Sequence, residues 1–303
     1  MLFRSVNPHQ EYKKAYDHLH NGRYQAGFRL FEYRWHPAIL ANQTIPYARE
    51  PKNVPVWNGE SLLGKSIVIQ TEQGFGDVIQ YARFIPFLKA LGASKVVVLT
   101  HTSLIHLLGQ MECIDQLTNM TEEGPAVECD YWIGLMSLPY YISCSMPYIK
   151  QLFPISSKKI VGSEGYLEAI PSNIPKKIGV NWEASKGQLH FIKSIADHEM
   201  LKLVGDDCYS LNPTSSSYFH PLPDDGWGKD WAKTASHMKA LKGVVTVDTG
   251  TAHLAGALGV KTIVLLPKEE FICWRWKNGR WYDSVVALRQ EEYKRIPELI
   301  ARM

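Results

Sequence analysis

Two short segments of the chain place carboxylates and glycines directly after a β-rich run, and the second of them adds hydroxyl groups. The first segment is EQGFGD, from Glu72 to Asp77. Its two glycines would let a substrate approach the backbone closely. Asp77 would begin the helix that follows, where its carboxylate could accept a proton from an attacking hydroxyl group. The structural alternative is that Asp77 only caps this helix, because Asp is a favoured N-cap residue whatever the function.

The second segment is DTGTAH, from Asp248 to His253, and it also joins a strand-like run to a helical one. The hydroxyls of Thr249 and Thr251, the open backbone at Gly250 and the first N–H groups of a helix together suit an anion such as a diphosphate. His253 could add a further hydrogen-bond donor. The alternative is a capped helix that carries a buried, hydrogen-bonded histidine.

Two further segments carry positive charge. The loop at 186–194 contains Lys186, His190 and Lys193, and a lysine there could bind a phosphate as a point charge. The alternative is a solvated loop. The run CWRWKNGRWY at 273–282 alternates aromatic and basic residues, a pattern that can stack bases and bind phosphates. We favour the alternative for this run, an aromatic packing segment between domains.

The signatures of several other chemistries are missing. The segment at 72–77 lacks the third glycine of the G-x-G-x-x-G dinucleotide fingerprint, and the chain has no Walker A sequence and no G-x-S-x-G elbow. It also has no H-E-x-x-H and no Asp-x-Asp, so we expect no bound metal. The five cysteines are odd in number and widely spaced, which argues against a disulfide framework and a zinc knuckle.

Composition places the chain among folded globular proteins. Apolar residues make up 45% of the 303 residues and charged residues 21%, and the length suggests two domains at roughly 150 residues each. The net charge of +3 excludes binding to nucleic acid or membranes by bulk charge alone. No apolar stretch reaches the roughly 18 residues that span a bilayer, and the N-terminus lacks the apolar segment of a signal peptide. We therefore expect a cytoplasmic protein without a transmembrane segment.

The elements that must position these segments follow a repeated strand–helix order. A helical hairpin at 8–36 would turn at Asn21-Gly22, and a proline-rich linker follows to residue 55. Periodicity in the first half predicts strands at 66–71, 95–100 and 130–135 and a helix at 77–91. In the second half it predicts strands at 177–182, 208–212, 243–247 and 261–266, and helices at 197–204, 229–241, 252–258 and 291–302. Both halves are therefore Rossmann-like, with a boundary within 154–175.

Four segments together resemble the glycosyltransferase domain of tetratricopeptide-repeat-fused bacterial and phage proteins. Those proteins are related to the ADP-heptose heptosyltransferases of glycosyltransferase family nine. Residues 57–93 resemble the start of that domain, 244–267 its donor-site segment and 273–284 its D-W-R-W…D-S-x-W-Y ending. Residues 22–35 are similar to the last tetratricopeptide hairpin before it. The resemblance covers about residues 10–290.

The resemblance implies an α/β protein of the GT-B fold, with two facing Rossmann-like domains, a short N-terminal helical hairpin and a C-terminal crossover helix. A single tetratricopeptide-like hairpin and linker would occupy residues 1–50, an acceptor domain 51–160 and a nucleotide-sugar donor domain 161–290. The helix at 291–303 would pack back on the acceptor domain.

The resemblance also implies an inverting, metal-independent transfer of a sugar from a nucleoside-diphosphate sugar, without a cofactor. Asp77 corresponds to the family's proposed general base, and Lys193 to the lysine that contacts the donor phosphate. The residues that match the family's donor-binding segment are Asp248, Thr249, Gly250, Thr251 and His253. Acceptor positioning in the loop after the first strand would fall to Glu72, Gln73, Gly74 and Gly76.

The chain departs from the family's pattern at three places. Cys273 stands where the family has an Asp, and only one repeat hairpin is present, so a long peptide-binding superhelix is absent. The stretch at 210–226 is hard to align, so the family's ribose-binding acidic residue is not assigned. The sugar, the base and the oligomeric state therefore stay open, and the acceptor could be a glycan, a lipid, a protein or a modified base. Two other classes also stay open. One is a sugar-nucleotide epimerase of GT-B architecture, and the other is a non-catalytic module that binds a nucleotide or a partner.

Overall fold

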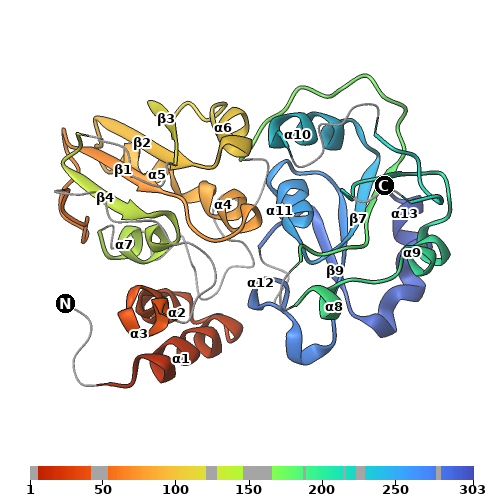
Figure 1. The fold of residues 1–303 in the computed structure, drawn as a ribbon, viewed down its shortest axis with the longest axis horizontal. Coiled ribbons are helices and arrows are strands. Elements are labelled where there is room, and N and C mark those ends of the chain that lie inside the picture. Colours follow the sequence, from red (N-terminus) through yellow and green to blue (C-terminus); the bar gives the residue numbers. More distant parts are fainter. Residues whose placement is uncertain are drawn as a thin grey trace. The chain divides into compact units, whose positions relative to one another are not determined.

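The computed structural model describes residues 6–41, 54–120, 128–145, 166–186, 189–213, 216–222, 229–277 and 281–303. The chain divides into two compact units (Figure 1). Unit 1 comprises Met1–Ile105 and Met111–Val161, and unit 2 comprises His106–Gln110 and Gly162–Met303. Each unit is built around one parallel sheet. None of the described helices is long and apolar enough to cross a membrane.

The sheet of unit 1 has four strands in the order β3-β2-β1-β4, and every pair is parallel. The chain runs outward from β1 to β2 and β3, and then returns to place β4 on the other side of β1. The loops after β1 and β4 therefore leave the sheet in opposite directions, which makes this a switch point of the strand order, where open α/β sheets bind ligands. The strands are β1 (Ser66–Gln70), β2 (Lys95–Thr100), β3 (Gln116–Asn119) and β4 (Tyr131–Gly134).

The sheet of unit 2 repeats this plan with five parallel strands in the order β6-β5-β7-β8-β9. Its switch point lies between β5 and β7. The strands are β5 (Ile178–Asn181), β6 (Cys208–Ser210), β7 (Gly243–Val247), β8 (Thr262–Leu265) and β9 (Val285–Leu288). The sequence predicted all of these strands except β3 and β9, which are edge strands of their sheets and are only partly buried.

The predicted helix at 77–91 is wrong in its start and its continuity. It begins at Phe75 with Gly74 as N-cap, and it breaks into α4 (Phe75–Tyr81), η2 (Ala82–Phe84) and α5 (Pro86–Ala90). Pro86 has no N–H to donate to the carbonyl of Ala82, so the α-helical ladder cannot continue through it. The Ile85 N–H bonds that carbonyl in the tighter 3₁₀ manner instead.

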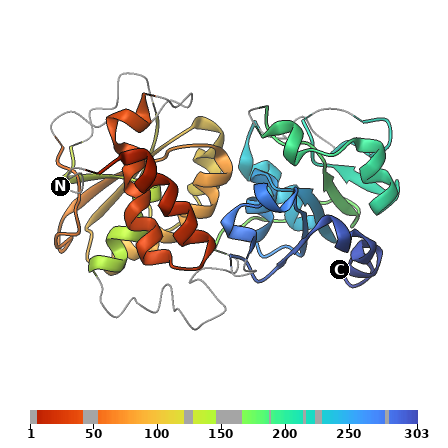
Figure 2. The same ribbon diagram turned by 90° about the horizontal axis from the view of Figure 1, so that it is seen from below.

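The N-terminal hairpin turns at Asn21-Gly22 as predicted. Its two helices lie so close that a Cβ on Gly27 would stand 2.7 Å from Leu19 Cγ, so glycine is required at this crossing. Figures 1 and 2 both show the hairpin beside α7, against which α2 packs. The helices of this part are α1 (Pro8–His20), α2 (Tyr24–Phe31), η1 (Glu32–Trp35), α3 (Pro37–Leu40), η3 (Leu135–Ser137) and α7 (Leu138–Ser145).

Helices flank the strands of unit 2 in the expected alternation. They are α8 (His190–Lys193), α9 (Asp197–Val204), α10 (Trp231–Ala240), α11 (Gly250–Ala257), η5 (Glu269–Phe271), α12 (Trp274–Lys277), η6 (Gln290–Arg295) and α13 (Ile296–Ala301). A further helix, α6 (Thr102–Leu108), follows β2.

The final helix is placed differently from the prediction that it crosses back to the acceptor domain. Ile296 of α13 is fully buried in the core of unit 2, next to Leu288 and Val247. Leu299, Ile300 and Met303 pack against the same core. Ile296, Leu299 and Ile300 give α13 one apolar face, which the sheet and α9 of its own unit bury, and Met303 follows the helix.

We predict that Ile296→Ala destabilises unit 2 by about 2–5 kcal/mol, since it removes a fully buried aliphatic side chain. Amide hydrogen exchange should speed up in β5, β7 and β8 and stay unchanged in β1 and β2. Ile170→Ala is the matched control, because Ile170 is 86% exposed in the same unit. A loss of protection in β1 and β2 would instead place the helix on unit 1.

Candidate functional site

Unit 2 brings Lys193 and Asp248 together at its switch point. Asp248 follows β7 directly, and Lys193 ends the short helix α8 in the connection after β5. The Lys193 ammonium nitrogen lies 2.7 Å from Asp248 Oδ2. The sequence predicted both residues for a donor site but gave no reason for them to touch. Their contact follows from the strand order, because β5 and β7 are neighbours in the sheet.

The Asp248 carboxylate is buried, and each of its oxygens faces one partner. Its Oδ1 accepts a hydrogen bond of 2.7 Å from the indole nitrogen of Trp276, while Oδ2 faces Lys193. Burial acts to raise the pKa of Asp248, but the charges of Lys193 and His253 and the two hydrogen bonds outweigh it and lower the pKa. Asp248 is therefore an anion at neutral pH, and it fixes the direction of the Lys193 ammonium.

Helix α11 begins immediately after this carboxylate. Gly250 and Thr251 are its first two residues, so their N–H groups have no carbonyl within the helix to bond. The Thr251 hydroxyl accepts a hydrogen bond of 2.8 Å from the side-chain amide of Asn181, at the end of β5. The same amide donates to Leu211 O at 3.1 Å. Asn181 thus ties the start of α11 to the neighbouring strands. The helix N-terminus, with N–H groups of the kind that favour an anion, follows directly after the carboxylate that Lys193 faces.

His253 is one turn into α11, and aromatic rings enclose it. Its ring stacks on Trp276 with 5.1 Å between ring centroids, and its Nδ1 lies 3.0 Å from the Tyr282 hydroxyl. Gly256, one turn further along, permits this packing, since a Cβ there would stand 2.5 Å from the Tyr282 ring. His253 is 5% exposed. The contacts described here match the buried, hydrogen-bonded alternative for His253.

The described aromatic residues of the segment at 273–282 pack inside unit 2. Trp274, Trp276 and Trp281 are each at most 5% exposed, so their rings offer no open face to a nucleic-acid base. These contacts within unit 2 match the packing alternative, and its placement between domains stays a prediction. Sequence reasoning missed that Trp276 and Tyr282 hold Asp248 and His253. The W-R-W pattern at 274–276 drew attention to the segment, but it did not indicate which side chains the segment contacts. Cys273 accepts a hydrogen bond of 3.0 Å from the Arg275 guanidinium.

Lys193 differs from the other two basic residues of its loop in the partner that it contacts. Lys186 is exposed to solvent. His190 Nδ1 lies 2.7 Å from Ala184 O, a contact that closes the loop on itself. Of the three basic residues predicted in this segment, Lys193 is the one that the structure places beside Asp248.

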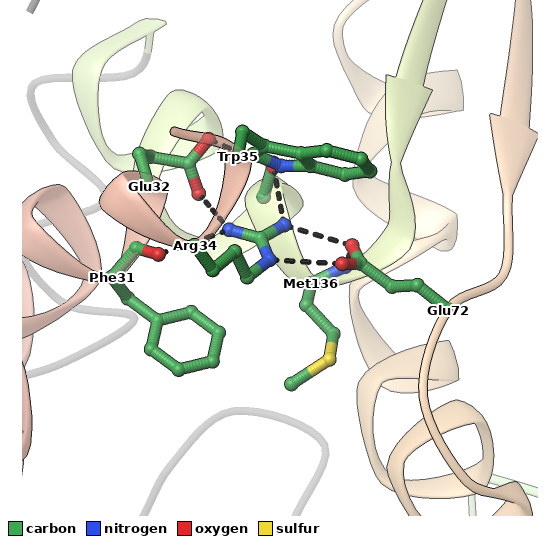
Figure 3. Close-up of polar contacts among 7 residues, drawn as sticks. Phe31, Glu32, Arg34, Trp35, Glu72 and Met136 are labelled. Atoms are coloured by element: carbon green, nitrogen blue, oxygen red, sulfur yellow. Dashed lines mark hydrogen bonds and ion pairs between the residues drawn. The ribbon is translucent and has the colours of Figure 1, made fainter. Parts of the chain in front are cut away.

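In unit 1, Glu72 is buried and paired with Arg34, and its predicted part in acceptor positioning stays a prediction. Its side chain is fully buried, and Arg34 forms a bidentate pair with it. Arg34 Nε lies 2.9 Å from Glu72 Oε2, and Arg34 Nη2 lies 2.8 Å from Glu72 Oε1. The Met136 N–H also donates to Oε1 at 3.0 Å. Figure 3 shows Arg34 between the carboxylates of Glu32 and Glu72. Glu72 therefore anchors the hairpin to the end of β1.

The second carboxylate of this cluster is Glu32, whose Oε1 lies 2.6 Å from Arg34 Nη1. Its Oε2 accepts a hydrogen bond of 2.8 Å from the Ser137 hydroxyl. Burial raises the pKa of Glu32 in spite of the guanidinium beside it. The two carboxylates hold the pKa of Arg34 above its usual value, although burial alone would lower it. Sequence reasoning missed Arg34 and Ser137, because residues from three separate segments make up the cluster.

Asp77 is the third residue of α4 and is half-buried. Gly74 takes the N-cap position, so the alternative that Asp77 only caps the helix is wrong. Asp77 Oδ1 accepts a hydrogen bond of 2.9 Å from the Gln80 side chain, one turn along. Gly76 is the second helical residue. The structure thus leaves the Asp77 carboxylate at the N-terminal end of α4, where the helix dipole favours its ionised form.

Gln73 has a backbone φ of +66°, and among the described residues it is the one non-glycine residue with a positive φ. This left-handed conformation costs a non-glycine residue of order 1–3 kcal/mol and persists only where the surroundings impose it. The strained residue lies directly between Glu72 and the Gly74 cap. Such strain is concentrated at functional sites.

No group of three or more His, Cys, Asp or Glu side chains gathers as a metal site within the ranges that the structure describes. Metal independence of the reaction stays a prediction.

Comparisons with known proteins identify the fold. No protein-family model matches the chain. A stretch of 74 residues, 23% of the chain, is 36% identical to Protein FlbA of Caulobacter vibrioides, and this match spans 11% of that protein's length.

Solved structures match most of the chain. A glycosyl transferase family 9 protein from Veillonella parvula matches with a TM-score of 0.56 and 13% identity, over 82% of this chain and 92% of that one. The E. coli heptosyltransferase WaaC, solved with ADP, matches with a TM-score of 0.54 and 13% identity, over 78% of this chain and 99% of that one. These matches confirm the predicted GT-B-like α/β fold with two parallel sheets. The tetratricopeptide relationship of the hairpin stays a prediction.

We predict that Lys193→Met lowers the free energy of unfolding by about 1–3 kcal/mol at pH 7, because the buried Asp248 carboxylate loses its counter-ion. Chemical denaturation of both forms measures the difference. Lys202→Met is the matched control, since Lys202 is 71% exposed and its ion pair with Glu199 lies on the surface.

The effect of Lys193→Met should depend on pH. The pKa of Asp248 in the folded protein lies below its unfolded value, so the stability that this carboxylate contributes is present at neutral pH and is lost as the pH falls through the folded pKa. A protonated Asp248 needs no cation. The difference between the variant and the native protein should therefore narrow below about pH 4. A difference that stays constant down to pH 3 would contradict the pairing.

Proposed function

We propose that the protein is an inverting, metal-independent glycosyltransferase that acts in the cytoplasm. It would transfer a sugar from a nucleoside-diphosphate sugar of the ADP-heptose type to an acceptor hydroxyl group. One observation carries the proposal. Lys193, the buried Asp248 and the N-terminus of α11 meet at the switch point of unit 2. The shared fold of family 9 glycosyltransferases supports it, since the E. coli relative was solved with ADP.

The donor diphosphate would bind where the structure gathers positive charge. Gly250 and Thr251 would donate their N–H groups to a phosphate oxygen, and the dipole of α11 favours a negative charge at that point. Lys193 would add a full positive charge on the same side. Thr249 and its hydroxyl stand at the helix N-cap, next to these donors. Asp248 would orient the Lys193 ammonium, and His253 would hold the Trp276 ring by stacking on it.

This arrangement would do the chemical work that transfer to a hydroxyl requires. The bond between the anomeric carbon and the diphosphate breaks, and the negative charge that develops on the leaving oxygen needs donors fixed in advance. Lys193 and the α11 amides meet that need, because Asp248 and Asn181 already hold them in place.

The acceptor hydroxyl must lose a proton as it attacks, and Asp77 is the group we propose to receive it. Its carboxylate is half-buried at the start of α4, and the Gln80 amide orients one oxygen. Gly74 and Gly76 on either side of Phe75 leave little side-chain bulk around it. The acceptor could be a glycan, a lipid, a protein or a modified base.

We predict that a nucleoside diphosphate stabilises the protein against heat. A ligand at about 100 times its Kd should add roughly 2.7 kcal/mol to the free energy of unfolding. A panel of ADP, UDP, GDP and CDP identifies the base. Lys193→Ala should weaken the binding about tenfold, or roughly 1.4 kcal/mol, while the exposed control Lys202→Ala binds as the native protein does. If no nucleotide shifts the melting temperature of a folded sample, the donor site is refuted and the non-catalytic module gains support.

We predict that Asp77→Asn lowers kcat for sugar transfer by about 10²–10⁴-fold and leaves donor affinity unchanged, since it removes a base and keeps the shape of the side chain. The measurement is product formation with the donor found above. Asp17→Asn, at an exposed position of α1, serves as the control. Retained turnover in Asp77→Asn would remove the base assignment, and an altered sugar without transfer would favour an epimerase.

A further inference from the structure

One buried side chain of the N-terminal segment, Arg34, lies at the switch point of the sheet of unit 1. In an open parallel sheet this position, between the loops after β1 and β4, is where ligands bind. Here Arg34 fills it from η1, and contacts Glu72 after β1 and Ser137 after β4. We propose that Arg34 is a positioning residue for the proposed base, and that the hairpin is a working part of the acceptor side rather than an appended partner-binding repeat. The inference rests on the proposed function.

Arg34 cannot itself bind a substrate, because it has no donor left. A guanidinium carries five N–H groups. Arg34 is fully buried and directs them at five acceptor atoms, which are Glu72 Oε2, Glu72 Oε1, Ser137 Oγ, Glu32 Oε1 and Phe31 O. Its effect on the reaction must therefore pass through a residue that it holds.

Glu72 is the residue through which Arg34 reaches the loop. The two parallel hydrogen bonds from Arg34 fix the plane of the Glu72 carboxylate, and the Met136 N–H fixes one of its oxygens again. Gly134 makes room for this pair. A Cβ at that position would stand 2.6 Å from Glu72 Oε1 and 2.6 Å from the Trp35 ring.

The backbone beyond Glu72 needs such an anchor. Gln73 has its φ of +66° immediately after Glu72, and Gly74 then caps the helix in which Asp77 is the third residue. A strained conformation persists only where its surroundings determine it. A rigid Glu72 on one side and the Gly74 cap on the other supply these surroundings, so the place of Asp77 depends on Arg34.

The hairpin also lies within electrostatic range of the base. Tyr12 of α1 packs on Phe31 with 5.7 Å between ring centroids, and Arg34 lies over the same Phe31 ring at 5.0 Å. Burial raises the pKa of Tyr12, and the carboxylates of Glu72 and Asp77 act in the same direction, while Arg34 acts against them. The ring cluster of the hairpin and Asp77 therefore belong to one local environment within unit 1.

The test compares Arg34→Lys with Leu19→Ala. Lysine keeps the buried positive charge but loses the planar fork that grips Glu72. Leu19 is fully buried in the hairpin and touches none of the Arg34 cluster in the contacts described above. Glu72→Gln, which keeps the shape and removes the charge, is the second variant if Arg34→Lys does not fold.

The first readout is amide hydrogen exchange in the loop from Gln73 to Val78, and it needs no activity. We expect exchange to speed up about tenfold in Arg34→Lys or Glu72→Gln, and to stay at the native rate in Leu19→Ala. Unchanged exchange in the Arg34 and Glu72 variants, or equal acceleration in the Leu19 control, overturns the inference.

The second readout separates catalysis from donor binding. In Arg34→Lys, kcat should fall about 10²-fold through misplacement of the base, with an unchanged Kd for the nucleoside diphosphate. A fall in Leu19→Ala of the same size would mean a merely structural role and would overturn the inference. A native protein that transfers no sugar refutes the proposed function, while the exchange rates still decide whether Arg34 holds the loop.

Discussion

Each unit of this protein buries a carboxylate at the end of a central strand, and the rest of each site is arranged around the need to neutralise it. A charge taken out of water is costly unless it is paired and hydrogen-bonded. In unit 2, Lys193 and Trp276 satisfy Asp248. In unit 1, Arg34 and the Met136 N–H satisfy Glu72. The cation comes in both cases from a segment far away in the sequence.

The two buried ion pairs differ in whether a ligand can reach the cation, because the side chains of Lys193 and Arg34 differ in exposure to solvent. The Lys193 side chain is 21% exposed, so a diphosphate could approach its ammonium. The Arg34 side chain is fully buried, and all its donors are in use. The first pair is therefore open to the ligand that we propose, and the second joins two parts of the fold. A buried anion paired with a cation thus leaves one cation accessible and encloses the other.

Much of this arrangement could be predicted from the sequence, and the misses have physical causes. Apolar runs identified the buried central strands, and strand–glycine–helix patterns located Asp77 and Asp248. The edge strands β3 and β9 were not predicted, because their residues are only partly buried. Glu72 was assigned to the acceptor because nothing near it in the sequence suggests its partner, Arg34, which lies 38 residues away. The role of Trp276 was missed for the same reason, since Asp248 is 28 residues before it.

The Arg34 joint also has a consequence for the order in which the chain folds. Its contacts span 38 residues to Glu72 and 103 residues to Ser137. Closing loops of such length costs entropy before any contact forms, so long-range contacts are completed slowly. The guanidinium can reach all its acceptors only after β1, β4 and the hairpin have met. We therefore expect the complete set of Arg34 contacts to form late in the folding of unit 1. During synthesis the set cannot be complete until Ser137 has left the ribosome.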